Sequence, residues 1–219
     1  PNLVFIGGMH GDESSGVLAL HRVMSRKERL RPLLRGNVFG LVGNLTALAR
    51  GERYISHDLN RGWHPEHPKG AGADNRAPEE IIHEVEEQLG LWRYIDELIH
   101  SSDAPFFFID LHSTASPTSP FITINDTLMN RRFARRIPVP TVMGVDDHLN
   151  DPLLSYITDL GHTALSFEGG LHHDPESIRN HEALIWLCLV CTKAIKKIEI
   201  PHFNKHYHLL KSNAAKNRK

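Results

Sequence analysis

A histidine and a glutamate lie three residues apart in the segment GGMHGDE at residues 7–13. The nitrogen of His10 and a carboxylate oxygen of Glu13 form a pair of ligands that suits zinc. The segment follows the apolar run at residues 2–6, so it lies where a buried strand would end and where open α/β sheets bind ligands. A glycine-rich turn in which Glu13 caps a helix explains the same pattern equally well.

A second histidine, His112, ends the apolar run that starts at Pro105 and includes Asp110. Because parallel strands end at the same edge of a sheet, we expect His112 to emerge beside His10. Two histidines and one glutamate leave a fourth zinc position open for water, as in catalytic sites, whereas structural sites prefer four protein ligands, usually including cysteine. A hydrogen-bonded histidine without a metal is the alternative.

The segment RYISHDLNR at residues 53–61 carries side chains that suit a small anionic substrate. The planar guanidinium of Arg61 matches a carboxylate, and Asn60 can add an amide hydrogen bond. Arg53 can stabilise negative charge that develops on an oxygen, and Asp58 can hold the free ring N–H of a metal-binding histidine. A surface loop with ordinary ion pairs is the alternative interpretation.

Glu168 follows the apolar run at residues 163–167 and precedes two glycines. A carboxylate at the end of a strand can take a proton from water and later deliver it to a leaving amine. The alternative is a glutamate that only ends the strand before a glycine turn.

Apolar runs of strand length alternate with helical patterns, which predicts an α/β sandwich around a mostly parallel or mixed sheet. The expected strands are 3–7, 37–42, 105–111, 121–124, 141–144 and 163–167, and the expected helices are 14–30, 78–100, 128–136, 152–160 and 176–197. Residues 43–78 read as a long irregular segment, and loops of that length tend to carry function. We expect residues 1–200 to form a catalytic domain and residues 201–219 a basic tail or the start of a truncated C-terminal region.

The composition fits one globular domain, with 219 residues, 40% hydrophobic and 23% charged. A net charge of -1 gives no overall basic footprint for nucleic acid, and no apolar run approaches the length of a membrane span. We therefore expect a small-molecule partner and neither nucleic acid nor membrane. The only cysteines, Cys188 and Cys191, lie in an apolar helical run, so we expect core packing and a cytoplasmic protein.

Five motifs occur in a fixed order, and with them the sequence resembles the succinylglutamate desuccinylase/aspartoacylase group of the zinc carboxypeptidase-like superfamily. The motifs are GMHGDESSG at 8–16, GN at 43–44 with Ala47, RYISHDLNR at 53–61, DLH at 110–112 and FEG at 167–169. The resemblance covers roughly residues 2–190. It implies a three-layer α/β/α sandwich around a mixed, mostly parallel sheet.

The resemblance also implies a metal centre with one zinc ion per chain. His10, Glu13 and His112 would be its ligands, and Asp58 would support one of the histidines.

Four further residues match positions that act on the substrate in this group. Arg53 would polarise the scissile carbonyl, Asn60 and Arg61 would bind a substrate carboxylate, and Glu168 would be the general acid and base. The implied reaction is hydrolysis of the amide bond of an N-acyl amino acid or a similar small amide. The alternatives are a zinc carboxypeptidase that acts on peptide or cell-wall-derived ends and a non-catalytic metal- or ligand-binding domain.

One departure from the group concerns the substrate. Aspartoacylases carry an additional substrate-binding arginine shortly before the catalytic glutamate, but residues 152–167 contain neither lysine nor arginine. We therefore do not expect acetylaspartate to be the substrate. Tyr156 lies in this stretch and is either a pocket residue or a tyrosine that packs its helix.

Overall fold

The computed structural model describes residues 1–64, 82–144 and 151–216. Six strands form one sheet in the order β2-β1-β3-β6-β4-β5. The strands are β1 (Asn2–Gly7), β2 (Asn37–Val42), β3 (Phe106–Thr114), β4 (Phe121–Ile124), β5 (Thr141–Met143) and β6 (Thr163–Leu171). Strands β2, β1, β3 and β6 are parallel to one another, β4 runs antiparallel to β6, and β5 is parallel to β4. The prediction of a mixed, mostly parallel sheet is confirmed.

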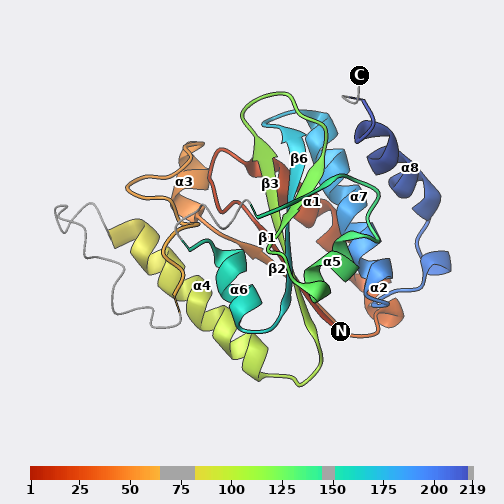
Figure 1. The fold of residues 1–219 in the computed structure, drawn as a ribbon, viewed down its shortest axis with the longest axis horizontal. Helices are drawn as coiled ribbons and strands as arrows, with labels where there is room; N and C mark the ends of the chain where they lie inside the picture. The colour runs from red at the N-terminus through yellow and green to blue at the C-terminus, as the bar shows by residue number, and fades with distance from the viewer. Residues whose placement is uncertain (65–81, 145–150, 217–219) are drawn as a thin grey trace.

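Helices cover both faces of this sheet, which confirms the predicted three-layer sandwich (Figure 1). The α-helices are α1 (Ser14–Met24), α2 (Lys27–Leu30), α3 (Leu45–Arg50), α4 (Ile82–His100), α5 (Leu128–Ala134), α6 (Leu153–Asp159), α7 (Pro175–Cys191) and α8 (Phe203–Asn213). Short 3-10 turns lie at η1 (Arg31–Leu33) and η3 (Lys197–Glu199).

Two hydrophobic clusters lie on opposite faces of the sheet. Alternate residues of β1 point to opposite sides: Leu3 and Phe5 pack with α1, α5 and α7, whereas Val4 and Ile6 pack with α4 and α6. Side chains along a strand alternate in this way, and a parallel strand covered on both faces is therefore apolar throughout.

The strands that carry the candidate site are longer than their apolar runs predict. β3 continues through His112 to Thr114, and β6 continues through Glu168 to Leu171. Hydrogen bonding between the parallel strands extends past the last apolar residue, so polar side chains that seemed to follow the strands lie within them.

Several helix boundaries also differ from the prediction. The expected helix 14–30 divides into α1 and α2, and the irregular segment contains α3, whose first turn is capped by the Asn44 side chain. Helix α7 ends at Cys191 rather than residue 197, because Lys193 adopts a left-handed backbone conformation with φ 64°. Of the expected helix 78–100, residues 78–81 lie outside the described residues.

Helix α8 was not predicted at all. It lies against α7, and its buried residues include Leu210 and Asn213. The Asn213 side chain donates a 2.8 Å hydrogen bond to Asn180 of α7. The assignment of residues 201–219 to a separate region stays a prediction. Across the described residues, none of the helices has the length and apolar character that a membrane span requires.

Candidate active site

The strand alternation brings polar side chains together at the carboxyl end of the parallel strands. In β3, Asp110 and His112 alternate with Ile109 and Leu111, which pack in the cluster beneath α1 and α7. Register pairs Asp110 with Ser166 and His112 with Glu168 of β6. These four polar side chains therefore share the opposite face, on the side of α4 and α6.

His10 and Glu13 reach the same place from the turn that follows β1. Gly11 lets this turn pass close to α3, because a Cβ atom there would lie 2.1 Å from the backbone of Ala47. Glu13 immediately precedes α1, but its side chain makes no capping hydrogen bond. The carboxylate instead contacts both histidines and accepts a 2.6 Å hydrogen bond from the Ser113 backbone N–H. The structure thus favours a ligand role over the helix-capping interpretation.

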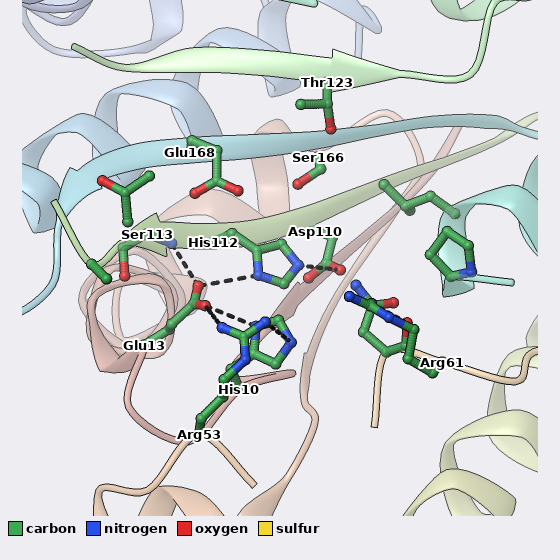
Figure 2. Close-up of a pocket in the computed structure, with 15 residues that line it drawn as sticks. His10, Glu13, Arg53, Arg61, Asp110, His112, Ser113, Thr123, Ser166 and Glu168 are labelled. Carbon is green, nitrogen blue, oxygen red and sulfur yellow. Dashed lines mark hydrogen bonds and ion pairs between the residues drawn. The ribbon is translucent and has the colours of Figure 1, made fainter. Parts of the chain in front are cut away.

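His10, Glu13 and His112 form a buried cluster that suits one metal ion (Figure 2). Glu13 Oε1 lies 2.8 Å from His10 Nδ1, and Glu13 Oε2 lies 3.1 Å from His112 Nδ1. One ligand atom from each residue falls within 4.8 Å of the other two. The remaining nitrogens face carboxylates, with His10 Nε2 at 3.0 Å from Asp58 and His112 Nε2 at 2.8 Å from Asp110. Such partners orient metal-binding histidines and leave the other nitrogen free for the ion.

The electrostatics of the cluster also favour a cation. Burial would lower the pKa of His112, but the charges of Asp110 and Glu13 outweigh it and raise that pKa well above its usual value. Burial would raise the pKa of Glu13, but the two histidines hold it well below its ordinary range. The carboxylates therefore stabilise positive charge at the point where a metal ion would lie.

The two predicted arginines approach the cluster from the loop at residues 53–61. An Arg53 Nη atom lies 3.0 Å from His10 Nε2, and the guanidinium is 3.4 Å from Glu13 and 3.6 Å from Asp58. Arg61 lies 3.5 Å from the same Asp58 carboxylate and donates a 2.7 Å hydrogen bond to the Asn60 carbonyl. Burial would raise the pKa of Asp58, but the contacts with His10, Asn60 and Arg61 lower it strongly. Asp58 is thus the ionised group that links both arginines to His10 of the cluster.

Asn60 is fixed by the first turn of α6. Its side-chain oxygen accepts a 3.0 Å hydrogen bond from the backbone N–H of Leu153, and its own backbone N–H donates to Asp58 at 2.9 Å. The residue is buried and lines the same cavity as Arg61.

Helix α4 holds this loop with two side chains that the sequence analysis did not identify. Glu84 accepts hydrogen bonds from the backbone N–H groups of Ile55 and Ser56, from the Ser56 hydroxyl and from Asn44. Gln88, one helical turn later, donates to the carbonyl of Arg61 at 2.8 Å. A buried acid and amide spaced by four residues on an otherwise amphipathic helix are the signal in the sequence.

Glu168 faces the metal cluster across a cavity of about 260 Å³ (Figure 2). Burial raises its pKa to about 7, although the nearby His112 opposes the shift. Among the described residues, none forms a hydrogen bond with the buried Oε2 atom. The group is therefore poised between its two protonation states near neutral pH.

The rest of the cavity wall is small and largely uncharged. Thr123, Leu154 and Ser166 also line it, and none of them was predicted from the sequence. Thr123 and Ser166 lie on strands, and Leu154 lies near the start of a helix. Which side chains of these elements face the cavity becomes clear only once the order of the strands in the sheet is known. Tyr156 does not line the cavity; it is buried, and its hydroxyl accepts a 2.9 Å hydrogen bond from Trp92 of α4. The helix-packing interpretation of Tyr156 is the better one.

His172, in the turn that follows β6, is largely buried beside the site. Its side chain is 14% exposed, and Nδ1 lies 2.8 Å from the Ser113 hydroxyl. Its Nε2 atom lies 3.9 Å from Asp12, too far for a direct hydrogen bond.

Comparison with known proteins gives one family. Residues 1–185 match the Succinylglutamate desuccinylase/Aspartoacylase catalytic domain. Succinylglutamate desuccinylase from Pseudomonas paraeruginosa is 34% identical over 73 residues, which are 32% of this chain and 21% of that protein. An N-acyl-aromatic-L-amino acid amidohydrolase (carboxylate-forming) from Xenopus tropicalis is 33% identical over 116 residues, 52% of this chain and 34% of that protein.

Solved structures show the same fold. The succinylglutamate desuccinylase/aspartoacylase from Rhodobacter sphaeroides superimposes with a TM-score of 0.64 at 20% identity, covering 90% of this chain and 56% of that one. Murine aminoacylase 3 gives a TM-score of 0.54 at 19% identity, covering 90% and 65%. The chain spans little more than half the length of the Rhodobacter protein, and its matches cover about a third or less of the two curated relatives. Since the family match covers most of the chain, the protein belongs to the succinylglutamate desuccinylase/aspartoacylase family.

Proposed function

We propose that the protein is a zinc-dependent hydrolase that cleaves the amide bond of an N-acyl amino acid or a similar small amide bearing a carboxylate. The observation that carries the proposal is the arrangement of a metal-suited His–Glu–His cluster opposite a buried Glu168 with a raised pKa. The names of the curated relatives, a desuccinylase and an amidohydrolase, support the same class of reaction.

His10, Glu13 and His112 would hold one zinc ion, with Asp58 and Asp110 orienting the histidines. When bound, zinc supplies a Lewis acid that polarises a carbonyl and lowers the pKa of water. Three protein ligands leave room for water or substrate, as catalytic zinc sites require.

Glu168 is the group that moves protons in this proposal. In its ionised form it takes a proton from the attacking water, and in its protonated form it delivers that proton to the departing amine nitrogen. A pKa of about 7 suits both directions, because neither form is strongly disfavoured at neutral pH.

Arg53 and Arg61 interact with two different negatively charged groups of the substrate. Arg53 lies beside the metal ligands, so its guanidinium faces the oxygen on which charge develops during attack. Arg61, with Asn60, lies farther along the cavity wall and binds a carboxylate that is charged throughout the reaction.

The cavity supports a small substrate. A volume of about 260 Å³ lies just below the range of about 300–1,000 Å³ that is typical of ligand pockets. Among the described residues that line it, Arg53 and Arg61 are the cationic side chains apart from the metal-site histidines. With Arg53 assigned to the scissile carbonyl, one arginine remains for a carboxylate, which disfavours acetylaspartate.

A cytoplasmic location is part of the proposal. Cys188 and Cys191 are both free, and burial raises the pKa of both thiols. Unpaired cysteines suit a reducing compartment.

The test is a hydrolysis screen of zinc-loaded protein. We expect release of free amino acid from one or more N-acyl amino acids, loss of that activity with a chelator and its return with zinc. A matched screen of short peptides separates the amidase from a carboxypeptidase. Zinc binding without hydrolysis in either screen would instead indicate a non-catalytic metal-binding domain.

A further inference from the structure

A fully buried histidine lies directly behind the candidate site, on the opposite face of the sheet. His181 is in the middle of α7, which packs against β6. Its ring lies edge-on to Phe167, with centroids 5.3 Å apart. Phe167 belongs to the hydrophobic cluster beneath α1 and α7, whereas His112 and Glu168 project from the other face of the sheet. His181 therefore cannot touch a substrate in the cavity.

The His181 ring reaches the backbone of the strand that carries a metal ligand. Its Nε2 atom lies 3.0 Å from the carbonyl oxygen of His112, and Nδ1 lies 2.8 Å from the carbonyl of Ser177 in the preceding turn of α7. A neutral imidazole can donate to only one of these two carbonyls, and in the Nε2–H tautomer it donates to the carbonyl of His112. The His112 peptide is thus tied to α7 from behind.

That support falls where the sheet itself is irregular. The register between β3 and β6 shifts between His112 and Thr114. Such an irregularity disrupts the regular ladder of hydrogen bonds, so the ladder alone holds the end of β3 less firmly. A side-chain donor at this point replaces part of the missing constraint.

The same ring also fixes the strand that carries Glu168. A Cβ atom on Gly169 would lie 2.1 Å from His181 Cε1, so the ring occupies the space that a side chain there would need. The neighbouring Asn180 donates a 2.8 Å hydrogen bond to the Gly169 carbonyl. Asn180 and His181, which are consecutive in α7, thereby hold β3 and β6. They do so next to the register pair of His112 and Glu168.

We propose that His181 is a positioning residue that sets the distance between the metal ligand His112 and the acid/base Glu168. The inference rests on the proposed function. Displacement of a reacting group by about 1 Å can cost about 100-fold in rate, so a small shift of either strand matters. Outer partners of metal ligands typically change metal affinity 10- to 100-fold when removed.

The test compares three substitutions at this position. His181→Leu keeps an apolar body without a donor, His181→Gln keeps an N–H donor at the reach of Nε2, and His181→Asn keeps one only at the reach of Nδ1. We expect zinc affinity, measured by competition with a chelator, to fall about 10- to 100-fold in the Leu and Asn variants. The Gln variant should recover most of it. For a hydrolysed substrate, kcat should fall with little change in KM, because the loop carrying Arg61 is not involved.

Thr192→Val is the matched control. Thr192 is buried at the end of the same helix, and within the described part of the chain its hydroxyl bonds only to α7, at the carbonyls of Cys188 and Leu189. It should lower the melting temperature without changing zinc affinity. If the Gln variant binds zinc no better than the Asn variant, or if all three bind it like the parent, His181 only packs the core and the inference is wrong. The Gln–Asn comparison decides even if the Leu variant does not fold.

The zinc titration needs no substrate, so the two proposals fail separately. A parent protein that binds zinc but hydrolyses no N-acyl amino acid overturns the proposed function, and the affinity comparison still decides the role of His181. A parent that binds no zinc overturns both.

Discussion

The two halves of the candidate site are built in different ways. His112 and Glu168 lie on adjacent strands and are register partners, and His10, a proposed metal ligand, lies in the turn after a third strand. Arg53, Asp58 and Arg61 lie on a loop that belongs to no strand or helix. The strand half is positioned by backbone pairing together with contacts from α7, whereas the loop half is positioned by side chains of α4.

The difference indicates how each half tolerates change. Strand pairing is spread over many backbone groups, so replacing a site residue on a strand removes its chemistry and leaves the frame intact. The loop depends on a few side-chain hydrogen bonds, chiefly those of Glu84 and Gln88. Removing one of those supports should disturb several functional residues at once.

The largest effect should come from the strand half. In His112→Ala, the metal cluster loses one of its three ligands while the sheet remains. We expect little or no zinc to remain bound after dialysis and hydrolysis to fall to background. Metal analysis checks the first outcome, and circular dichroism checks that the fold persists. Zinc binding as tight as that of the parent would remove His112 from the site.

Glu168→Gln, also in the strand half, should impair catalysis without impairing metal binding. The shape is kept and the proton shuttle is lost, so kcat should fall about 10²- to 10⁴-fold with unchanged zinc content. Because burial raises the pKa of Glu168 to about 7, the parent should lose kcat/KM as the pH falls and this base becomes protonated. The variant should lack that acidic limb. Near-normal turnover would rule out this role for Glu168.

The two arginines test whether the loop half has two functions. Arg53→Ala should lower kcat, by about 10²- to 10³-fold if it provides one contact to the developing oxyanion. Arg61→Ala should mainly raise KM, because it binds a carboxylate present in both ground and transition states. Steady-state kinetics on one substrate distinguishes them. An effect of Arg61→Ala on kcat alone would reverse the assignment.

The smallest effect on chemistry should come from Glu84→Gln, which touches no substrate. Its amide would face a backbone N–H of residue 55 or 56, so stability should fall by about 1–3 kcal/mol, and kcat and KM should both worsen modestly. Burial would raise the pKa of Glu84, but the hydrogen bonds from Ser56, Ile55 and Asn44 outweigh it and lower that pKa. Because the pKa of Glu84 is lower in the folded state, its ionised form stabilises the fold at any pH above its unfolded-state pKa. This stabilisation is lost as the pH falls through the folded-state pKa.

Urea unfolding of parent and variant therefore provides the measurement. The stability difference should be largest near pH 7 and shrink toward pH 3. A difference that does not change over this range would show that the Glu84 charge does not hold the loop. Glu97→Gln is a control on α4, since Glu97 lies two turns or more from the loop contacts of Glu84 and Gln88.

Much of the strand half could be predicted from the sequence because its signals are local. The apolar runs before His10, His112 and Glu168 predict buried strands, and parallel strands end at one edge. What could not be predicted is the extension of β3 and β6 past those runs, because hydrogen bonding to a neighbour decides it. The α/β sandwich could be predicted from the alternation of apolar runs with helical patterns, and its three layers from the resemblance that the ordered motifs carry.

For the loop half, the sequence predicts which residues carry the chemistry but not how the loop arranges them. Its chemistry is visible in Arg53, Asp58 and Arg61, but its shape depends on Glu84, which lies more than 20 residues away in the sequence. Helix α8 escaped prediction for a similar reason. Its stability comes from packing against α7 through residues such as Leu210, and the surrounding sequence is mainly basic and polar.

The reversal of direction at β6 has a consequence for how substrate preference can evolve. The three proposed metal ligands lie on the parallel side of the sheet, whereas the antiparallel neighbour β4 contributes Thr123 to the cavity wall. Changes in β4 and the segments around it can thus reshape one wall of the cavity without altering the strands that carry His112 and Glu168. The sheet thus separates the proposed metal site from one wall of the substrate cavity, and Glu168 lies on β6, the strand next to β4.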